Sequence, residues 1–382
     1  MIAFVQTFGL HTESGGSRVL RSLLRTSHPP ALSINTGLIP ARPDPEVEEV
    51  HIPLRHNFGG IEFTRLRPFL GVFDWLSSSR FETRLRQTLE SYQVRAIHLI
   101  PHAYEVVPVA RVAREMGLPL FLTVHDDITY TSCGHPCLRQ MAAALGSAWR
   151  TARGLFVISD EMGREYSQRF GAREYSVVTD GLTCVPNGPK RRPDKSLRLY
   201  FMGLFHYTYN PNLRAVLDAL KIIRGKLPDW NISLTCRCGE ISLPVCSDDV
   251  PLEVRPFARE EDVENDMLSA DVLYQPLPLD ASAKSFGRFS MSTKMITYLG
   301  SGLPIFYHGP EDAAAYQLLM RHKAAVACTT LNPEELAKVL LGAVERREAV
   351  VRNALALARR QFILAEQQRR FWEPINEICN GS

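Results

Sequence analysis

The stretch MIAFVQTFGLHTESGGSRVLRSLL, residues 1–24, contains one complete strand, turn and helix. Residues 1–8 are mostly apolar and predict a buried strand. Ser14, Gly15 and Gly16 predict a turn into a helix whose apolar residues between 19 and 24 fall on one face. Because similar apolar runs and helical patterns alternate along the rest of the chain, the sequence predicts an α/β protein with mostly parallel sheets.

The same alternation continues in both halves of the chain. In the first half, strands are predicted at residues 31–36, 47–54, 96–101, 118–125, 154–159 and 175–181, and helices at 80–92, 105–116, 137–151 and 160–170. In the second half, strands are predicted at 197–203, 230–238, 251–257, 271–278, 303–309 and 324–330, with helices from 210, 259, 292, 311 and 333. A longer basic stretch, 347–378, predicts a terminal helix.

Length and one composition shift predict two domains. The chain has 382 residues, more than the ~250 to 300 at which a single core stops growing. The segment VPNGPKRRPDKS, residues 185–196, interrupts every periodicity and predicts a linker. We therefore expect Rossmann-like, doubly wound domains at 1–184 and 197–355 facing an interdomain cleft, and a C-terminal helix, 356–382, that crosses back to the first domain.

Composition limits the possible partners. The 44 Lys and Arg against 41 Asp and Glu leave a net charge of +3, too small to indicate nucleic acid. No apolar run approaches the ~20 residues of a membrane-spanning helix, and no leading segment resembles a signal peptide. The expected location is the cytoplasm. If the protein contacts a membrane, the expected contact is peripheral and on the inner face.

Gly15 and Gly16 follow the first strand and open a helix, so their backbone amides could face an anion. The alternative is an ordinary turn and helix cap, since the full glycine fingerprint of dinucleotide sites is absent. His125, Asp126 and Asp127 end a strongly apolar strand, where a side chain is held rigidly next to a cleft. We expect a working role for His125 rather than Asp127; the alternative is a solvated loop in which an aspartate caps a turn.

The segment FGRFSMSTKMITYLGSGLP, residues 286–304, combines a basic glycine-containing loop with Ser292 and Thr293 at a helix start. Free N–H groups at a helix start favour phosphate. Lys294 lies in the first turn, where the helix dipole disfavours a cation unless an anion is bound. The alternative is a solvated lysine on a surface helix.

The cysteines and a stretch of arginines and aromatic residues each have two interpretations. Cys133, Cys137, Cys236, Cys238 and Cys246 include zinc-ligand types, but without paired C-x-x-C spacing they are expected to be loop thiols, so no metal site is predicted. Arginines interleave with aromatic residues between 65 and 86, which could form a surface for anionic lipid or an acidic acceptor. An ordinary amphipathic helix is the favoured interpretation of that stretch.

The order of several motifs resembles the retaining, nucleotide-sugar-dependent glycosyltransferases of the GT-B fold, known as glycosyl transferases group 1. The motifs are ESGGSRVL (13–20), FLTVHDD (121–127), FVISDEMGREYSQRFG (156–171), YFMGLFHYTYNPNLRAV (200–216), SADVLYQPLP (269–278) and STKMITYLGSGLPIFYHGP (292–310). Their order and spacing over nearly the full length carry the resemblance.

The resemblance implies a UDP-, GDP- or dTDP-sugar as co-substrate, no resident cofactor, and no requirement for a metal. It implies transfer with retention to a glycan, lipid-linked or natural-product acceptor, as in polysaccharide biosynthesis. The catalytic candidates are His125, Asp126 and Asp280. The candidates for holding the donor and its phosphates are Gly15, Gly16, Gly203, His206, Phe257, Lys284, Arg288, Ser292, Thr293 and Lys294.

The sequence departs from the family at its acidic pair. Both family glutamates would fall on residues without a carboxylate, Phe289 and Thr297. Asp280 could supply a carboxylate from the preceding loop, and His206, Lys284 and Arg288 could replace the family's missing basic residues. Because of these departures, two alternatives stay open: a GT-B scaffold that binds without transfer, and a nucleotide-sugar epimerase that needs no acceptor.

Overall fold

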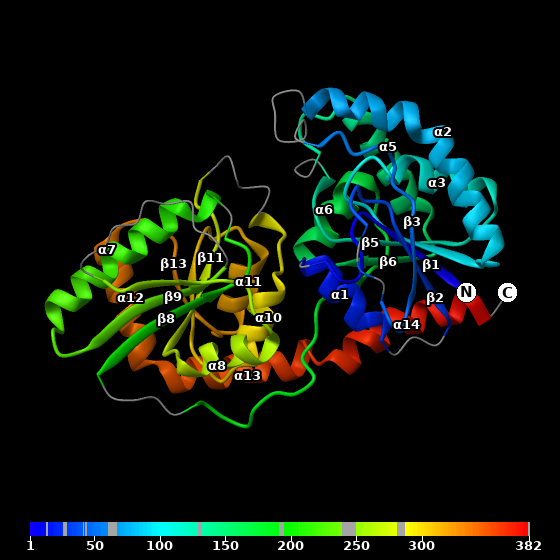
Figure 1. Ribbon diagram of the computed structural model, residues 1–382. Coiled ribbons are helices and arrows are strands. Elements are labelled where there is room, and N and C mark those ends of the chain that lie inside the picture. Colours follow the sequence, from blue (N-terminus) through cyan, green and yellow to red (C-terminus); the bar gives the residue numbers. More distant parts are fainter. Residues whose placement is uncertain are drawn as a thin grey trace. The chain divides into compact units, whose positions relative to one another are not determined.

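The computed structural model divides the chain into two compact units. It describes residues 1–382 apart from 13, 26–28, 41, 43, 60–66, 129–131, 191–194, 206, 239–249, 281–286 and 381–382. Unit 1 comprises Met1–Gly181 and Leu364–Ser382, and unit 2 comprises Leu182–Ile363 (Figure 1). The chain therefore leaves unit 1 once and returns to it at its C-terminal end.

Unit 1 contains a seven-stranded parallel sheet in the order β3-β2-β1-β4-β5-β6-β7. The strands are β1 (Ile2–Gln6), β2 (Ala31–Asn35), β3 (Glu48–His51), β4 (Ala96–Ile100), β5 (Leu120–Val124), β6 (Gly154–Val157) and β7 (Ser176–Val177). The helices are α1 (Gly15–Leu24), α2 (Arg67–Ser91), α3 (Val106–Glu115), α5 (Leu138–Thr151), α6 (Asp160–Phe170) and α14 (Leu364–Asn380). The strand order reverses between β1 and β4, which is where open α/β sheets bind ligands.

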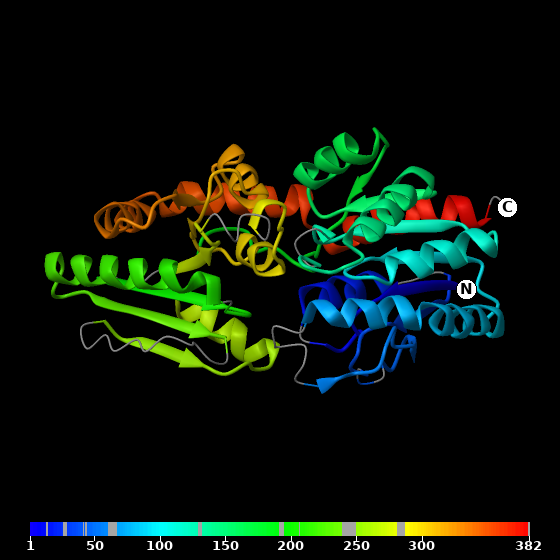
Figure 2. The ribbon, with the colours of Figure 1, turned by 90° about the horizontal axis from the view of Figure 1, so that it is seen from above.

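Both faces of this sheet are covered, because successive side chains of a strand point to opposite faces. On one face, Phe4 of β1 and His98 of β4 pack against Phe371 of α14, with ring centroids 6.1 and 5.0 Å from that ring. Apolar residues of α1 join the same cluster. On the other face lie α3 and α5, and α2 packs against α3 (Figures 1 and 2). The C-terminal segment thus completes a core built mostly by the first half of the chain.

Unit 2 contains a six-stranded parallel sheet in the order β10-β9-β8-β11-β12-β13. The strands are β8 (Ser196–Met202), β9 (Asn231–Arg237), β10 (Leu252–Arg255), β11 (Val272–Pro276), β12 (Ile305–His308) and β13 (Val326–Cys328). After the 3-10 turn η2 (Tyr207–Tyr209) come the helices α7 (Asn210–Lys226), α8 (Glu260–Ser269), α10 (Thr293–Leu299), α11 (Ala314–Arg321), α12 (Pro333–Glu345) and α13 (Arg347–Gln361). The switch point lies between β8 and β11.

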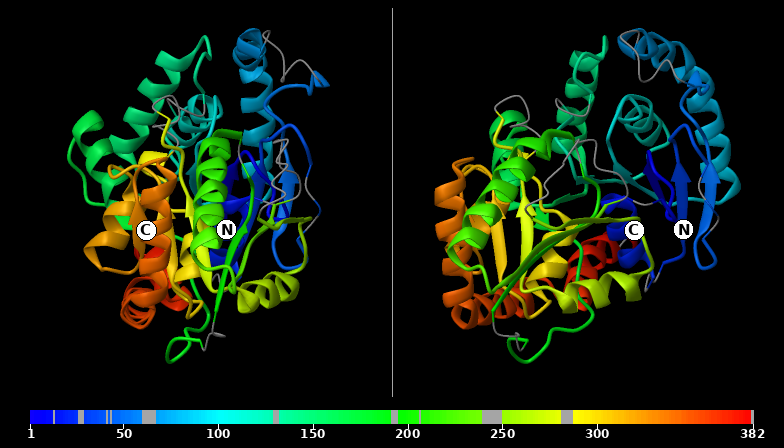
Figure 3. Two further views of the ribbon diagram at one scale, coloured as in Figure 1. Left: turned by 90° about the vertical axis from the view of Figure 1, so that its left-hand side faces the viewer. Right: turned by 60° about the vertical axis from the view of Figure 1, so that its left-hand side comes forward.

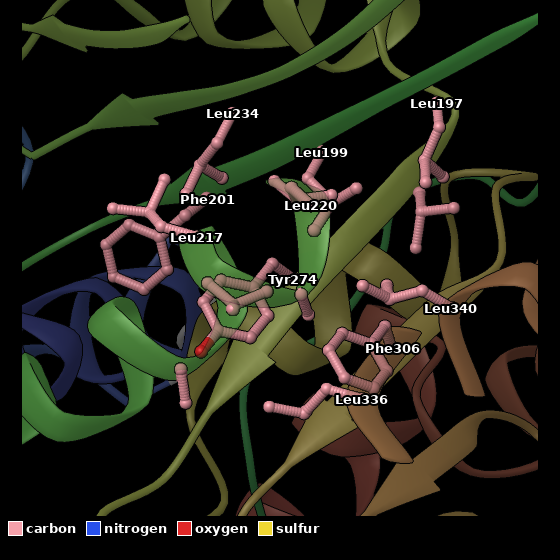
Figure 4. Close-up of a cluster of buried hydrophobic side chains, with 14 of the residues drawn as sticks. Leu197, Leu199, Phe201, Leu217, Leu220, Leu234, Tyr274, Phe306, Leu336 and Leu340 are labelled. Carbon is pink, nitrogen blue, oxygen red and sulfur yellow. The ribbon is translucent and has the colours of Figure 1, made fainter. Parts of the chain in front are cut away.

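Alternation along β8 explains the two cores of unit 2. Leu197, Leu199 and Phe201 point to the face that α7 and α12 cover, where leucines of both helices meet them (Figure 4). Tyr200 and Met202 point to the opposite face, which α8, α10, α11 and α13 cover. The predicted class, two doubly wound parallel-sheet domains, is confirmed.

Domain boundaries differ from the expected ones. Residues 182–190 belong to unit 2, where the Lys190 N–H donates to the Gly302 carbonyl (3.0 Å) and Arg347 donates to the Lys190 carbonyl (2.7 Å). Residues 191–194 lie outside the described part, and Ser196 already begins β8. At the other end, the boundary expected after residue 355 falls inside α13, and unit 2 continues to Ile363.

Two helix predictions were wrong in extent. The helix predicted at 80–92 is the second half of α2, which begins at Arg67, because apolar residues near its start lie on more than one side and hide the helical period. The single helix predicted over 347–378 is two helices, α13 and α14. Between them, the carbonyl of Phe362 accepts the N–H of Leu182 (2.7 Å), so the chain is tied down where the helix breaks.

Candidate functional site

The carboxyl ends of β1 and β5 bring Gly16 and His125 together in unit 1. Ser14 caps α1 by accepting the Ser17 N–H (3.1 Å), which places Gly16 in the first helical turn. A methyl group on Gly16 would lie 2.9 Å from the Phe8 ring and 3.5 Å from Nδ1 of His125. Two motifs more than 100 residues apart in sequence therefore line one small region.

His125 is a buried, neutral imidazole. Its side chain is almost fully buried, and in the described part of the chain its Nδ1 has no hydrogen-bond partner. Burial, helped by repulsion from His102, lowers the pKa of His125 to about 3. At neutral pH the ring can therefore exchange a hydrogen bond with a ligand without carrying a charge.

His102, which the sequence did not single out, adjoins both of these groups. Its ring centroid lies 5.9 Å from that of His125 and 5.4 Å from that of Phe8. Its Nδ1 lies 3.1 Å from the Ile100 carbonyl, and its Nε2 lies 3.6 Å from Oδ2 of Asp126. Since His102 follows β4, the neighbour of β1 at the switch point, the strand order could have found it.

The loop that carries His102 is fixed by a buried carboxylate. Oε1 of Glu105 accepts the N–H groups of His102 (2.6 Å) and Ala103 (3.0 Å). Burial raises the pKa of Glu105. Its other oxygen, Oε2, is buried and has no partner in the part of the chain that the structure describes. Glu105 therefore holds the backbone that positions the His102 ring.

Asp126 and Asp127 have different surroundings. The carboxylate of Asp126 is half exposed. In the described residues, His102 is its one ion-pair partner. Asp127 is buried, and its Oδ2 pairs with Nη1 of Arg169 at 3.2 Å. Asp127 therefore fastens α6 to the end of β5, and Asp126 is the aspartate that a ligand could reach.

In unit 2, Lys294 points inward from the first turn of α10. Its Nζ lies 4.2 Å from the Phe201 ring centroid and 5.5 Å from that of Tyr209. Burial lowers the pKa of Lys294 to about 7, against a smaller opposing effect of the Cys238 and Cys236 thiols. No carboxylate pairs with its ammonium in the described residues of unit 2. The ring contacts favour a held lysine over the solvated-lysine alternative, although the residue keeps intermediate exposure.

Gly203 and Ser292 complete the surroundings of Lys294. Gly203 has φ of 100°, a backbone that only glycine adopts without strain, and a methyl group on it would lie 3.7 Å from Cε of Lys294. Ser292 caps α10 by accepting the Met295 N–H at 3.3 Å, which leaves its hydroxyl hydrogen able to donate. Thr293 follows as the first residue of α10 and is partly exposed. The structure therefore brings four predicted residues to one place.

The remaining predicted residues of unit 2 are more scattered. Phe257 follows β10 with 48% of its surface exposed, Asp280 is exposed after β11, and Arg288 is exposed with its guanidinium 4.8 Å from the Phe289 ring centroid. His206 and Lys284 lie outside the described residues.

The residues at the two positions of the family's glutamates, Phe289 and Thr297, have structural roles. Phe289 is buried, and the Thr297 hydroxyl donates to the Thr293 carbonyl inside α10 (3.2 Å). Neither side chain replaces a carboxylate.

The cysteines do not form a metal centre in the described residues. The seven described cysteines are free thiols, and Cys246 lies outside the described residues. His135, between Cys133 and Cys137, is held by Asp74 (3.1 Å) and by the Cys137 N–H (3.0 Å). Within the described ranges, no group of three His, Cys, Asp or Glu side chains is placed to hold a metal ion.

Comparison with known structures identifies the architecture. An α,α-trehalose-phosphate synthase (UDP-forming) from Burkholderia vietnamiensis has a TM-score of 0.67 at 13% identity, covering 100% of this chain and 98% of that one. HepE of Anabaena in complex with UDP and glucose has a TM-score of 0.68 at 14% identity, covering 98% and 99%. A synthase from Burkholderia xenovorans in complex with glucose-6-phosphate has a TM-score of 0.67 at 12% identity, covering 97% and 99%. The class defined by fold is therefore GT-B.

Sequence comparison finds one match, which lies in the first domain. Residues 18–181 match the family model described as Glycosyl transferase 4-like domain. No curated protein sequence matches the chain. The resemblance inferred from the motifs is confirmed for the fold and for this glycosyltransferase domain, whereas the roles of single residues stay predictions.

Proposed function

We propose that this glycosyltransferase moves a sugar from a nucleotide diphosphate to a glycan, lipid-linked or natural-product acceptor with retention of configuration. One observation carries the proposal: the ammonium of Lys294 lies over Phe201 and Tyr209 beside Gly203, and no carboxylate pairs with it in the described residues. Lys294 is only partly exposed, and a cation that is partly removed from water without an anion is costly. A bound diphosphate would supply that anion.

Ser292 and Thr293 extend this argument at the start of α10. The Ser292 hydroxyl can donate to a phosphate oxygen while its own oxygen caps the helix. In transfer, charge develops on the departing diphosphate, and fixed donors and cations stabilise that charge more than they stabilise the bound donor. Retention by front-face attack then needs no protein nucleophile, and we propose that no divalent metal is required.

The edge of unit 1 is proposed to receive the acceptor and the donor sugar. His125 and Asp126 would orient sugar hydroxyls, with Gly15 and Gly16 allowing close approach of the backbone. The neutral ring of His125 and its unpartnered Nδ1 support a hydrogen-bonding role. Within unit 2, Asp280 and Arg288 are proposed as further contacts to the donor, since both are exposed.

For the nucleobase of the donor, uracil is the first to test. HepE of Anabaena was crystallised with UDP, and the Burkholderia synthases are described as UDP-forming. Phe257, half exposed after β10, could stack on a base. Transfer in the cytoplasm to a surface polysaccharide precursor is the setting that we propose.

Calorimetric titration with UDP, GDP, dTDP and CDP tests the proposal. We expect one nucleotide to bind, with affinity lowered by about 30-fold or more in Lys294→Met, which keeps the packing over the rings but removes the charge. Lys338→Met, an exposed lysine of α12, is the matched control and should bind as the wild type does. If none of the nucleotides binds, the proposal is wrong.

Turnover assays separate the alternatives. Incubation of the preferred nucleotide sugar with sugar acceptors, followed by NMR of the product, reports transfer and the anomeric configuration, and EDTA tests the absence of a metal requirement. The binding-only scaffold predicts nucleotide binding without consumption. The epimerase predicts a second hexose nucleotide when no acceptor is present.

A further inference from the structure

The first turns of α2 expose large apolar side chains. We define the apolar face of α2 as Phe69, Val72, Phe73, Trp75 and Leu76, whose surfaces are 65, 43, 42, 56 and 60% exposed. Phe58 extends it by packing against Phe73 in a tilted arrangement, with ring centroids 4.8 Å apart. The helix lies at the periphery of unit 1 (Figures 1 and 3). A contiguous exposed group of this kind marks an interaction surface.

The opposite side of α2 is fixed in place, so this exposure is not loose packing. A methyl group on Gly71 would lie 2.5 Å from Cδ of Pro136. Asp74 pairs with Arg55 (2.7 Å) and with His135 (3.1 Å). These contacts set the rotation of α2 about its axis and leave its apolar face outward.

Charge on the same helix indicates the chemistry of the partner. Arg80 and Arg84 are exposed in the turns that follow the apolar face and make no ion pair in the described residues. The carboxylate of Glu82 is paired with Arg111 (2.8 Å). Glu90 is exposed but lies about 15 Å beyond Arg80 along the axis, at 1.5 Å per residue. The exposed apolar end therefore adjoins positive charge.

We propose that the apolar face of α2, with Arg80 and Arg84, docks on a bilayer that contains anionic lipid. Aromatic rings would enter the headgroup region, where Trp is favoured, and the arginines would meet lipid phosphates. No helix in the described residues is long and apolar enough to cross a membrane, so the contact is peripheral. This inference goes beyond the proposed sugar transfer and does not depend on it.

Sedimentation of the full chain with vesicles tests the proposal. Vesicles of phosphatidylcholine with phosphatidylglycerol should bind the protein, and vesicles of phosphatidylcholine alone should bind it much more weakly. Phe69→Gln with Phe73→Gln should lower binding about 100-fold, since two rings leave the lipid. Arg80→Gln with Arg84→Gln should lower it about 30-fold at low salt, and only on the anionic vesicles.

Matched variants and a second measurement keep the result interpretable. Leu268→Gln, an exposed leucine of α8, and Arg114→Gln with Arg153→Gln, exposed arginines of unit 1, should change nothing. Unchanged melting temperatures and nucleotide binding would show that the variants fold. The proposal is overturned if the anionic vesicles do not bind, if both test pairs bind as wild type, or if ultracentrifugation shows a dimer that the phenylalanine pair dissociates.

Discussion

Unit 1 and unit 2 have the same strand order around their switch points, yet their carboxyl edges carry different chemistry. Unit 1 presents imidazoles, among them the neutral His125, and the half-exposed Asp126. Unit 2 presents Lys294, a cation beside Gly203 with no acidic partner in the described residues. The backbone determines where side chains meet, and the side chains determine what can be bound there.

The two units also differ in how their cores are closed. In unit 2, strands and helices of one continuous segment cover both faces. In unit 1, a helix from the far end of the chain covers an aromatic stack that includes His98. Unit 1 should therefore be more sensitive to changes in α14 and to acid.

The largest difference should follow from Phe371→Ala. The ring contacts Phe4, His98 and Phe156 with centroids 5.0 to 6.1 Å apart, and its loss should cost unit 1 about 3 to 5 kcal/mol. Urea unfolding in a Trp230→Phe background measures this, because the other three tryptophans lie in unit 1. Phe69→Ala, which removes an exposed ring, should lower the free energy of unfolding by less than about 0.5 kcal/mol. Equal losses for the two variants would contradict the special role of α14 in closing the core of unit 1.

Acid should destabilise unit 1 more steeply than unit 2. Burial lowers the pKa of His98 and of His125 to about 3 in unit 1, and that of His308 to about 4 in unit 2. Histidine in the unfolded chain has a pKa of about 6.5. Between that pH and the lower pKa of the folded state, the unfolded chain binds a proton on this histidine and the folded protein does not. Stability is thus lost as pH falls through that window, by up to about 1.4 kcal/mol per pH unit for each histidine.

Unfolding of unit 1 by urea between pH 7 and 4 checks this slope. His98→Phe with Thr123→Val, which removes the imidazole together with its hydroxyl partner (2.6 Å), should flatten the slope by one histidine. His56→Gln, an exposed position, should leave it unchanged. If the free energy of unfolding changes with pH equally in the wild type and the double variant, His98 is not a source of the acid sensitivity.

Nucleotide binding should weaken as pH rises through the pKa of Lys294. The pKa is about 7 in the free protein, and a bound anion would raise it, so affinity should fall about tenfold per pH unit above 7. Burial raises the pKa of Cys238 to about 11 and also raises the pKa of Cys236, so the thiols do not titrate there. Calorimetry from pH 6.5 to 9 checks this, and Lys294→Met should remove the dependence.

The smallest contrast is between two glycines. Gly203→Ala should cost about 1 to 3 kcal/mol, because its φ of 100° strains any other residue. Gly16→Ala should change stability by under about 1 kcal/mol, since better helix propensity offsets the contact with the Phe8 ring. Melting temperatures of the two variants measure the difference; a larger loss for Gly16→Ala would mean that Phe8 cannot move.

Local patterns were sufficient for the sheets, because most predicted strands are runs of apolar residues bounded by turns; the strand that contains β3 (EEVH) is an exception. They failed where a helix is apolar on several sides, as at the start of α2, and where Phe362 and Ile363 break a helix without proline or glycine. Within the candidate site, Gly16 and His125 could be predicted from their places after strands, and Lys294 from its place in the first turn of a helix. His102 could have been found from its place after β4, beside β1 at the switch point, but it was missed. The role of Glu105 could not be predicted, because it depends on a buried carboxylate that accepts two backbone N–H groups.

The return of α14 to unit 1 has a consequence during synthesis. Trp372 donates to the Leu23 carbonyl (2.9 Å), and Gln367 accepts the Thr179 N–H (2.9 Å), so both partners of these bonds come from distant parts of the chain. At ~5 to 20 residues per second, the ribosome must add all of unit 2 before α14 emerges, a delay of about 10 to 40 s. During that interval the Phe4 side of the nascent sheet stays open, and we expect it to be a binding site for chaperones.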